Sequence, residues 1–262
     1  MSDEPSKNPL INFIPKSLDN AIENLTDPPT KEAGNMFGDI WFLIFGNIGH
    51  AAQKRRMFYA HDLDLFKLGL ESSISLIPAE RKLDPDLQIV GPALENAKFC
   101  ISKKELRDMF TKLISNSMDS LKANFVHPSF GETIKQMTPL DAQNLKLFEH
   151  ESSLPFCEYR IYLNNGTYKI VHNLVFISNP DQYDLEAEAC SISSLCRLGL
   201  LEINSTSKLE PTEIYAPFYE TYLFENVSSI ATSLNGRPTI YERKIQTTPY
   251  GESFIKTCLT DF

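Results

Sequence analysis

The sequence predicts a mainly α protein of the α+β class, in which an N-terminal helical domain precedes a winged-helix-like domain with a β-hairpin. Three observations support this prediction. Apolar residues recur at three- and four-residue steps through the first half of the chain, as they do on one face of a helix. Alternating β-forming residues flank Asn164-Asn165-Gly166, a strong hairpin signal. After residue 184, a helix, a short strand, a later strand and a final helix follow in winged-helix order.

The composition is that of a globular protein. The chain has 262 residues, 42% hydrophobic and 23% charged, which suits one large domain or two small ones. Its net charge is −9: residues 1–130 carry 15 basic and 17 acidic side chains, and the rest carry 10 and 17. This acidic balance argues against non-specific nucleic-acid binding. The five cysteines lack a disulfide-like spacing, and the polar N-terminus is unlike a secretory signal. We therefore expect a cytoplasmic location.

Three regions are predicted along the chain. Residues 1–9 are polar, contain two prolines, and are expected to form a flexible tail. Residues 10–136 form the helical domain. Residues 137–262 form the winged-helix-like domain, because the hydrophobic helix that begins at Leu140 would be its first helix.

The apolar run at residues 36–48 has two interpretations. It is too short to span a bilayer, which needs about 20 apolar residues. We favour a core segment beneath the helix that follows. The alternative is an interfacial membrane patch formed by Trp41, Phe42 and Phe45, with the basic residues 54–56 close behind.

Proline, glycine and capping residues predict the helices of the first domain. A long helix is expected over 51–77, where apolar residues recur at helical steps. Gly91-Pro92 is expected to open the next helix, at 93–101, because proline is tolerated in a first turn. Ser102, followed three residues later by Glu105, is a capping-box pattern for a helix at 103–120. A short helix is expected at 129–136.

Helices and strands alternate in the second domain. Thr138-Pro139 is expected to cap a helix at 140–150, since threonine caps helices and proline suits their first position. Gly199 is expected to end the helix at 184–198. Residues 204–236 receive no assignment. The remaining predicted elements are strands at 158–163, 167–171, 200–203 and 239–246, and a helix at 248–259.

No recognised motif for catalysis, cofactors or metals occurs in the sequence. The five histidines stand far apart, and the zinc-binding and phosphate-binding patterns are absent. No serine or cysteine lies in a diagnostic nucleophile context. We predict no catalytic, cofactor-binding or metal-binding residues, and enzymatic activity is the less favoured interpretation.

The predicted winged helix raises the question of DNA binding. Its candidate recognition helix carries Asp184, Glu186 and Glu188 against Arg197, which would repel phosphates. Winged helices also bind proteins, and this charge pattern favours that use. A DNA-binding regulator stays as the alternative.

Several ordered segments resemble one protein family, the Abi-alpha (abortive infection alpha) proteins of bacterial anti-phage defence. The similarity extends over residues 30–260 and is strongest over 38–149. The segments are GDIWFLIFG (38–46), KRRMFYAHDLDLFKLGLESSISLIPAE (54–80), IVGPALENAKFCI (89–101), ELRDMFTKLISNSMD (105–119) and VHPSFGETIKQMTPLDAQNLKLFE (126–149).

The resemblance implies abortive-infection defence and carries over no catalytic residues. The acidic surface and the absence of a catalytic motif favour action through contacts with a phage or host protein, and self-association stays open. The alternatives are the DNA-binding regulator and a membrane-associated effector that uses residues 10–48. Four polar motif positions have no evident packing role: Glu95, Arg107, His127 and Lys135. They form either an ion-pair network that fixes helix angles, which we favour, or a polar groove for a phage component or small ligand.

Overall fold

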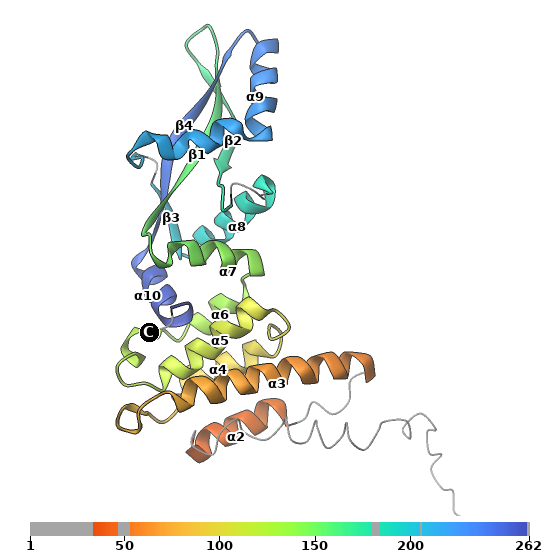
Figure 1. The fold of residues 1–262 in the computed structure, drawn as a ribbon, viewed down its shortest axis with the longest axis vertical. Helices are drawn as coiled ribbons and strands as arrows, with labels where there is room; N and C mark the ends of the chain where they lie inside the picture. Colours follow the sequence, from red (N-terminus) through yellow and green to blue (C-terminus); the bar gives the residue numbers. More distant parts are fainter. Residues whose placement is uncertain (1–33, 47–52, 180–183, 205, 261–262) are drawn as a thin grey trace, which may run out of the picture.

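Helices fill one end of the molecule, and a four-stranded sheet extends from the other (Figure 1). The computed structural model describes residues 34–46, 53–179, 184–204 and 206–260. Mainly helical structure with one antiparallel sheet confirms the predicted fold class. The helical end contains α2 (Gly34–Phe45), α3 (Gln53–Ser75), α4 (Leu87–Ala97), α5 (Lys104–Ser117) and α6 (Phe130–Lys135).

The sheet has the strand order β2-β1-β4-β3 and is antiparallel throughout. The predicted hairpin is confirmed, and Gly166 in its turn has a φ of +82°, which glycine adopts without strain. β1 pairs with β4 over its whole length, from Ser153 opposite Gln246 to Tyr162 opposite Arg237. The strands are β1 (Ser153–Tyr162), β2 (Tyr168–Val175), β3 (Leu201–Asn204) and β4 (Arg237–Thr247).

The remaining helices connect the two ends and cover the sheet. In Figure 1, α7, α8 and α10 lie between the helical end and the upper part of the sheet. The unassigned region 204–236 contains a 3₁₀ segment, η6 (Thr212–Glu220), and α9 (Tyr222–Ser233), both packed on the sheet. The others are α7 (Pro139–Lys146), α8 (Leu185–Arg197), α10 (Pro249–Cys258) and the 3₁₀ turns η3 (Ala79–Arg81), η4 (Ala123–Phe125) and η5 (Leu147–Glu149).

Two clusters of buried side chains hold these elements. The larger one joins the helical end to the lower sheet, and it includes Ile134 and Leu145 on either side of the predicted boundary at 136. The smaller one lies between the upper sheet and α9, around Tyr159 and Val227. The division into two domains stays a prediction, and the tail 1–9 and residues 10–33 lie outside the described residues.

Two predicted helix starts are wrong. α4 begins at Leu87, because the Asp86 side chain accepts a hydrogen bond from the Gln88 amide, so Gly91-Pro92 lies within the helix. α5 has Lys103 at its N-cap without a side-chain cap, so the expected capping box from Ser102 to Glu105 does not form. In contrast, the predicted cap of α7 is present, with reciprocal hydrogen bonds between Thr138 and Asp141.

The apolar run packs as core. Trp41 is fully buried and stacks on Phe66 of α3, with ring centroids 6.1 Å apart. Phe45 is also fully buried, with its ring 4.5 Å from that of Trp41. Of the three residues in the proposed interfacial patch, only Phe42 is exposed. Trp41 and Phe45 would have to leave the core to contact a membrane. No helix in the described ranges has the length and apolarity that a bilayer crossing requires.

Candidate functional site

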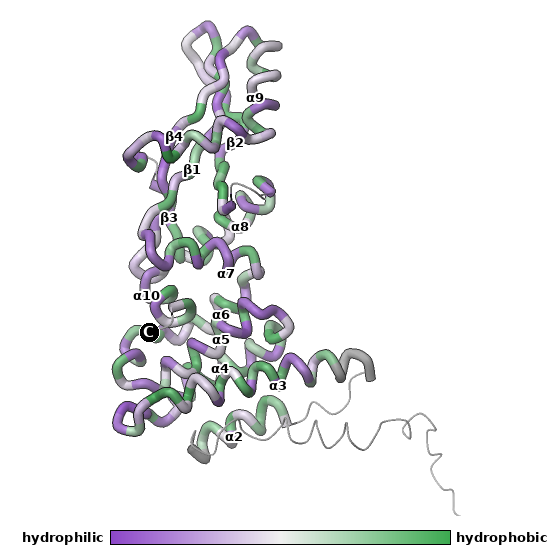
Figure 2. Tube along the Cα trace, viewed as in Figure 1, coloured by the Kyte–Doolittle hydropathy of each residue, from purple (hydrophilic) through white to green (hydrophobic). Residues whose placement is uncertain are grey.

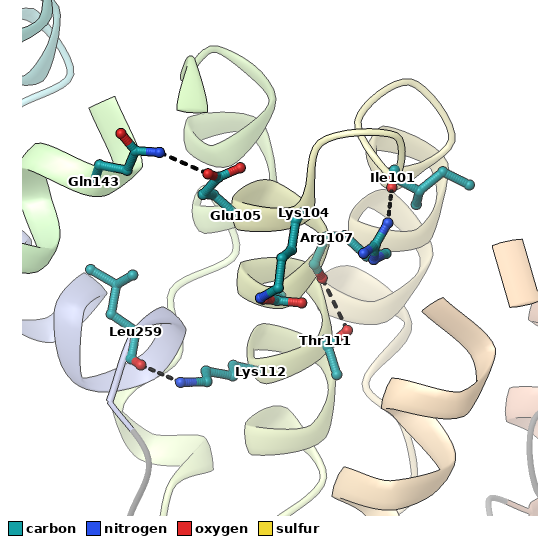
Figure 3. Close-up of polar contacts among 9 residues, drawn as sticks. Ile101, Lys104, Glu105, Arg107, Thr111, Lys112, Gln143 and Leu259 are labelled. Carbon is teal, nitrogen blue, oxygen red and sulfur yellow. Dashed lines mark hydrogen bonds and ion pairs between the residues drawn. The ribbon is translucent and has the colours of Figure 1, made fainter. Parts of the chain in front are cut away.

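Arg107 lies half-buried at the junction of three helices. Its Nη1 donates a hydrogen bond to the main-chain oxygen of Ile101 at 2.8 Å (Figure 3). The same atom lies 3.6 Å from Oδ1 of Asp62 on α3. Thr111, one turn on, donates to the main-chain oxygen of Arg107. The guanidinium therefore connects α5 with two other elements, α3 and the turn that follows α4.

Other polar side chains of α5 hold the second half of the chain. The Glu105 carboxylate accepts a hydrogen bond from Nε2 of Gln143 on α7 at 2.8 Å, and Lys112 donates to the main-chain oxygen of Leu259 (Figure 3). Asn116 donates to the main-chain oxygen of Thr257 at 2.8 Å. A hydrogen bond with its own backbone and the one from Gln143 lower the pKa of Glu105. α5 is thus the helix around which α3, α4, α7 and α10 are arranged.

Glu95 and Lys135 lie on the outer surface of α4 and α6. Glu95 pairs with Lys98 at 3.2 Å, and Lys135 pairs with Glu132 at 3.4 Å. Burial and the charge of Glu95 raise the pKa of Tyr59 to about 12, which keeps this phenol protonated. In the same region, the Glu132 carboxylate also accepts a hydrogen bond from Asn96 at 3.3 Å and so links α6 to α4.

His127 belongs to a separate hydrogen-bonded chain. Its Nδ1 lies 2.7 Å from Oγ of Ser129, which lies 2.7 Å from the Tyr250 hydroxyl, and that hydroxyl lies 2.9 Å from Oγ1 of Thr133. The Ser129 amide also donates to His127 Nδ1 at 3.2 Å. This chain closes the turn before α6 and fastens α6 to α10. The four polar motif residues therefore have separate partners.

The buried cysteines are poor nucleophiles. Burial raises the pKa of the Cys100, Cys157 and Cys258 thiols, and it raises the pKa of Cys196 to about 11. Protonated thiols react slowly, because the thiolate is the nucleophilic form. Within the described part of the chain, no three His, Cys, Asp or Glu side chains are placed to hold a metal ion.

The outer face of α3 is apolar as well as the inner one. The inner face buries Leu63, Phe66, Leu70 and Ile74 almost completely. The opposite side presents a second row, which we call the α3 stripe. It consists of Phe58, Leu65 and Leu68 of α3 and of Leu76, which directly follows the last residue of the helix; they are 70%, 37%, 52% and 79% exposed.

The α3 stripe is an extended apolar feature of the helical end. Its helical members, from Phe58 to Leu68, span about 15 Å, at 1.5 Å per residue. Figure 2 shows hydrophobic residues along α3 and along α2, which lies beside it. On α2, Phe42 and Leu43 are also exposed, at 63% and 79%. When a helix carries apolar residues on two sides, one side can pack in the core and the other is available to a partner. The sequence alone does not tell which of the two sides is buried.

Comparison with known proteins gave one match. A family model described as "Abortive infection alpha" matches residues 59–258, from the first half of α3 through α10. No curated protein and no solved structure matched the chain.

Proposed function

The chain belongs to the abortive infection alpha family, and we propose that it acts in this defence as a non-catalytic protein that binds a phage or host protein through the α3 stripe. The observation that carries the proposal is the exposure of four large apolar side chains, three on the outer face of α3 and one directly after its end. Such faces on a soluble protein mark interaction surfaces.

The size of the stripe sets its contribution to binding. Full burial of four large apolar side chains is worth at most about 6–12 kcal/mol, and these side chains are already partly buried. Association costs about 4–15 kcal/mol. The stripe therefore anchors a partner, and further contacts, for which Phe42 and Leu43 are placed on α2, are needed for tight binding.

The charges beside the stripe define the partner. Asp64 and Glu71 are seven residues apart and so lie on one flank of α3, whereas Asp62, on the other flank, is paired with Arg107 at 3.6 Å. An amphipathic helix with an apolar stripe and basic flanking residues would match this surface. An anionic membrane is a poorer match, because the chain carries a net charge of −9.

The predicted recognition helix gains no support as a DNA-binding element. Glu188 of α8 is buried and accepts a hydrogen bond from Asn144 at 2.6 Å. Asp184 caps the helix, and Arg197 donates to Gln136 at 3.1 Å. The two acidic side chains are thus used within the fold, whereas the contact of Arg197 lies on the exposed surface, and the DNA-binding alternative stays a sequence-based prediction.

The test is phage plaquing on cells that express the natural chain or the double variant Leu65→Glu/Leu68→Glu. We expect the variant to fold, as measured by circular dichroism, and to lose protection. A matched control is Leu121→Glu/Leu234→Glu, because both leucines are exposed and belong to neither α2 nor α3. We expect this control to protect as the natural chain does.

A binding measurement with purified proteins completes the test. A protein recovered with the natural chain should bind it directly once purified, and should bind the control but not the stripe variant. Protection by the stripe variant equal to that by the natural chain would contradict the proposal. A second contradicting result would be that the natural chain floats with lipid vesicles and the stripe variant does not, because the stripe would then bind lipid.

A further inference from the structure

The upper sheet has one covered face and one open face. The covered face packs Tyr159, Ile161 and Ile240 against Tyr215 of η6 and Val227 of α9. Neighbouring residues along a strand point to opposite faces, and residues directly opposite on paired strands share a face. The open face, which we call the Tyr–Arg face, therefore holds Glu158, Arg160 and Tyr162 of β1, Tyr168 and Ile170 of β2, and Arg237, Thr239, Tyr241 and Arg243 of β4.

Aromatic rings and guanidinium groups alternate across this face. The Arg160 guanidinium lies over the Tyr168 ring at 4.4 Å and over the Tyr241 ring at 3.6 Å. Arg243 lies over the Tyr241 ring at 4.9 Å. The rings of Tyr162 and Tyr168 are 5.5 Å apart. The result is a continuous series of π-systems across three strands.

One carboxylate organises the two inner arginines. Oε2 of Glu158 accepts hydrogen bonds from Nε and Nη2 of Arg160, the former at 2.8 Å, while Oε1 lies 2.7 Å from Nη2 of Arg243. Burial lowers the pKa of Arg160, but the hydrogen bond and charge of Glu158 together raise it above its ordinary value. Nε of Arg243 is buried and has no hydrogen-bond partner.

The face is positive although the protein is acidic. It carries Arg160, Arg237 and Arg243 against Glu158 alone, in a chain whose net charge is −9. Arg237 is exposed, and the rings of Tyr168 and Tyr241 are 49% and 38% exposed. The accessible groups are thus tyrosine rings next to cationic nitrogen atoms.

We propose that the Tyr–Arg face binds single-stranded nucleic acid. Open antiparallel sheets that combine exposed aromatic rings with cationic side chains bind single strands, because bases stack on the rings and phosphates pair with the cations. An apolar protein surface fits less well, because Ile170 is the one large aliphatic side chain that β2 exposes on this face. The inference concerns a surface other than the α3 stripe and does not depend on the proposed function.

In this proposal some residues contact the nucleic acid and others hold those residues in position. Tyr162, Tyr168 and Tyr241 contact bases, and Arg237 and Arg243 contact phosphates. Glu158 and Arg160 are positioning residues, because both are buried and hold the rings and Arg243 in place. The Arg243 Nε–H, which lacks a partner in the fold, is a donor available to a phosphate oxygen after a small movement of its side chain.

The experiment measures fluorescence anisotropy of labelled mixed-sequence oligonucleotides of about 16 nucleotides, the upper end of the site sizes known for single-strand-binding folds. Single-stranded DNA and RNA are tested as separate arms with the full chain. We expect Tyr241→Leu and Tyr168→Leu each to weaken binding about fivefold or more through lost stacking. With two phosphate contacts, raising salt from about 50 to 200 mM should weaken binding about sevenfold.

Matched controls separate binding from folding. Tyr219→Leu changes an equally exposed tyrosine on η6, and Arg197→Ala changes an exposed arginine on α8. We expect both to bind as the natural chain does, whereas Arg237→Ala and Arg243→Ala weaken binding and reduce its salt dependence. Thermal unfolding shows that the compared variants are folded.

Three results would overturn the inference. The first is an absence of single-strand binding to either arm at low salt. The second is equal weakening by Arg197→Ala and Arg237→Ala. The third is displacement of the oligonucleotide by polyglutamate of equal charge at equal concentration, since that would show a site for polyanions without base stacking.

Discussion

Gly251 of α10 packs directly against the main chain of Leu200. A Cβ at Gly251 would meet the Leu200 carbonyl group, with the carbonyl carbon only 2.9 Å away. Thr248, the N-cap of α10, donates its main-chain amide to the Leu200 oxygen at 3.1 Å. The start of α10 is therefore fixed on the turn between α8 and β3, and this contact requires a residue without a side chain.

We expect Gly251→Ala to destabilise the protein by about 3 kcal/mol or more, because backbone rather than a flexible side chain occupies the space. Urea unfolding followed by circular dichroism measures the change. Gly91→Ala is the matched control: Gly91 lies inside α4 with nothing within 4 Å of its added Cβ. Alanine should stabilise that position by about 0.5–1 kcal/mol. Equal effects of the two variants would contradict this account.

Arg107 is predicted to act through stability. Its side chain is only 12% exposed and holds the Ile101 oxygen and Asp62. Arg107→Ala should lower the free energy of unfolding by about 1–3 kcal/mol, because a buried acceptor and a carboxylate lose their partner. The exposed Arg197→Ala should change it by less than about 0.5 kcal/mol. Undiminished stability of Arg107→Ala, together with lost phage protection, would instead indicate a binding role.

Acid should destabilise the fold partly through Asp119. The Arg81 hydrogen bond lowers the pKa of this carboxyl below its model-compound value of 3.8. Below pH 3.8 the unfolded chain therefore binds a proton at Asp119 while the folded chain stays ionised, so the free energy of unfolding falls as pH falls. Asp119→Asn should be less stable at neutral pH and should flatten this dependence. Urea unfolding between about pH 6 and pH 2 tests it. Identical pH profiles of the two proteins would refute the prediction.

The cysteines should differ strongly in reactivity. Cys190 is exposed on α8, whereas Cys157 and Cys258 are buried with raised pKa values. For Cys196, whose pKa is raised to about 11, only roughly one thiol in 1,000 is ionised at pH 8. A disulfide reagent added to the folded protein at pH 8 should label Cys190 first. Cys190→Ser should remove the fast phase, and its persistence would show that another thiol is accessible.

Short-range signals in the sequence determined much of the fold. The cap of α7 by Thr138 and the hairpin turn at Gly166 both depend on residues a few positions apart. Local hydrogen bonds and backbone conformations of this kind form wherever those residues occur, so the sequence predicts them. Asp86, Asp184 and Thr221 cap α4, α8 and α9 in the same way, and their residue types are those that favour a helix N-cap.

Long-range packing decided the surfaces on which the proposed binding depends. α3 is apolar on both sides, and only the position of Phe66 against Trp41 shows that Phe58, Leu65 and Leu68 face outward. The Tyr–Arg face brings together side chains that are as far apart in sequence as Glu158 and Arg243. Their proximity follows from the register of β1 with β4, which the whole sheet and its core fix together. Helix caps and turns are therefore properties of the sequence, whereas which apolar face is covered and which charges meet are properties of the tertiary fold.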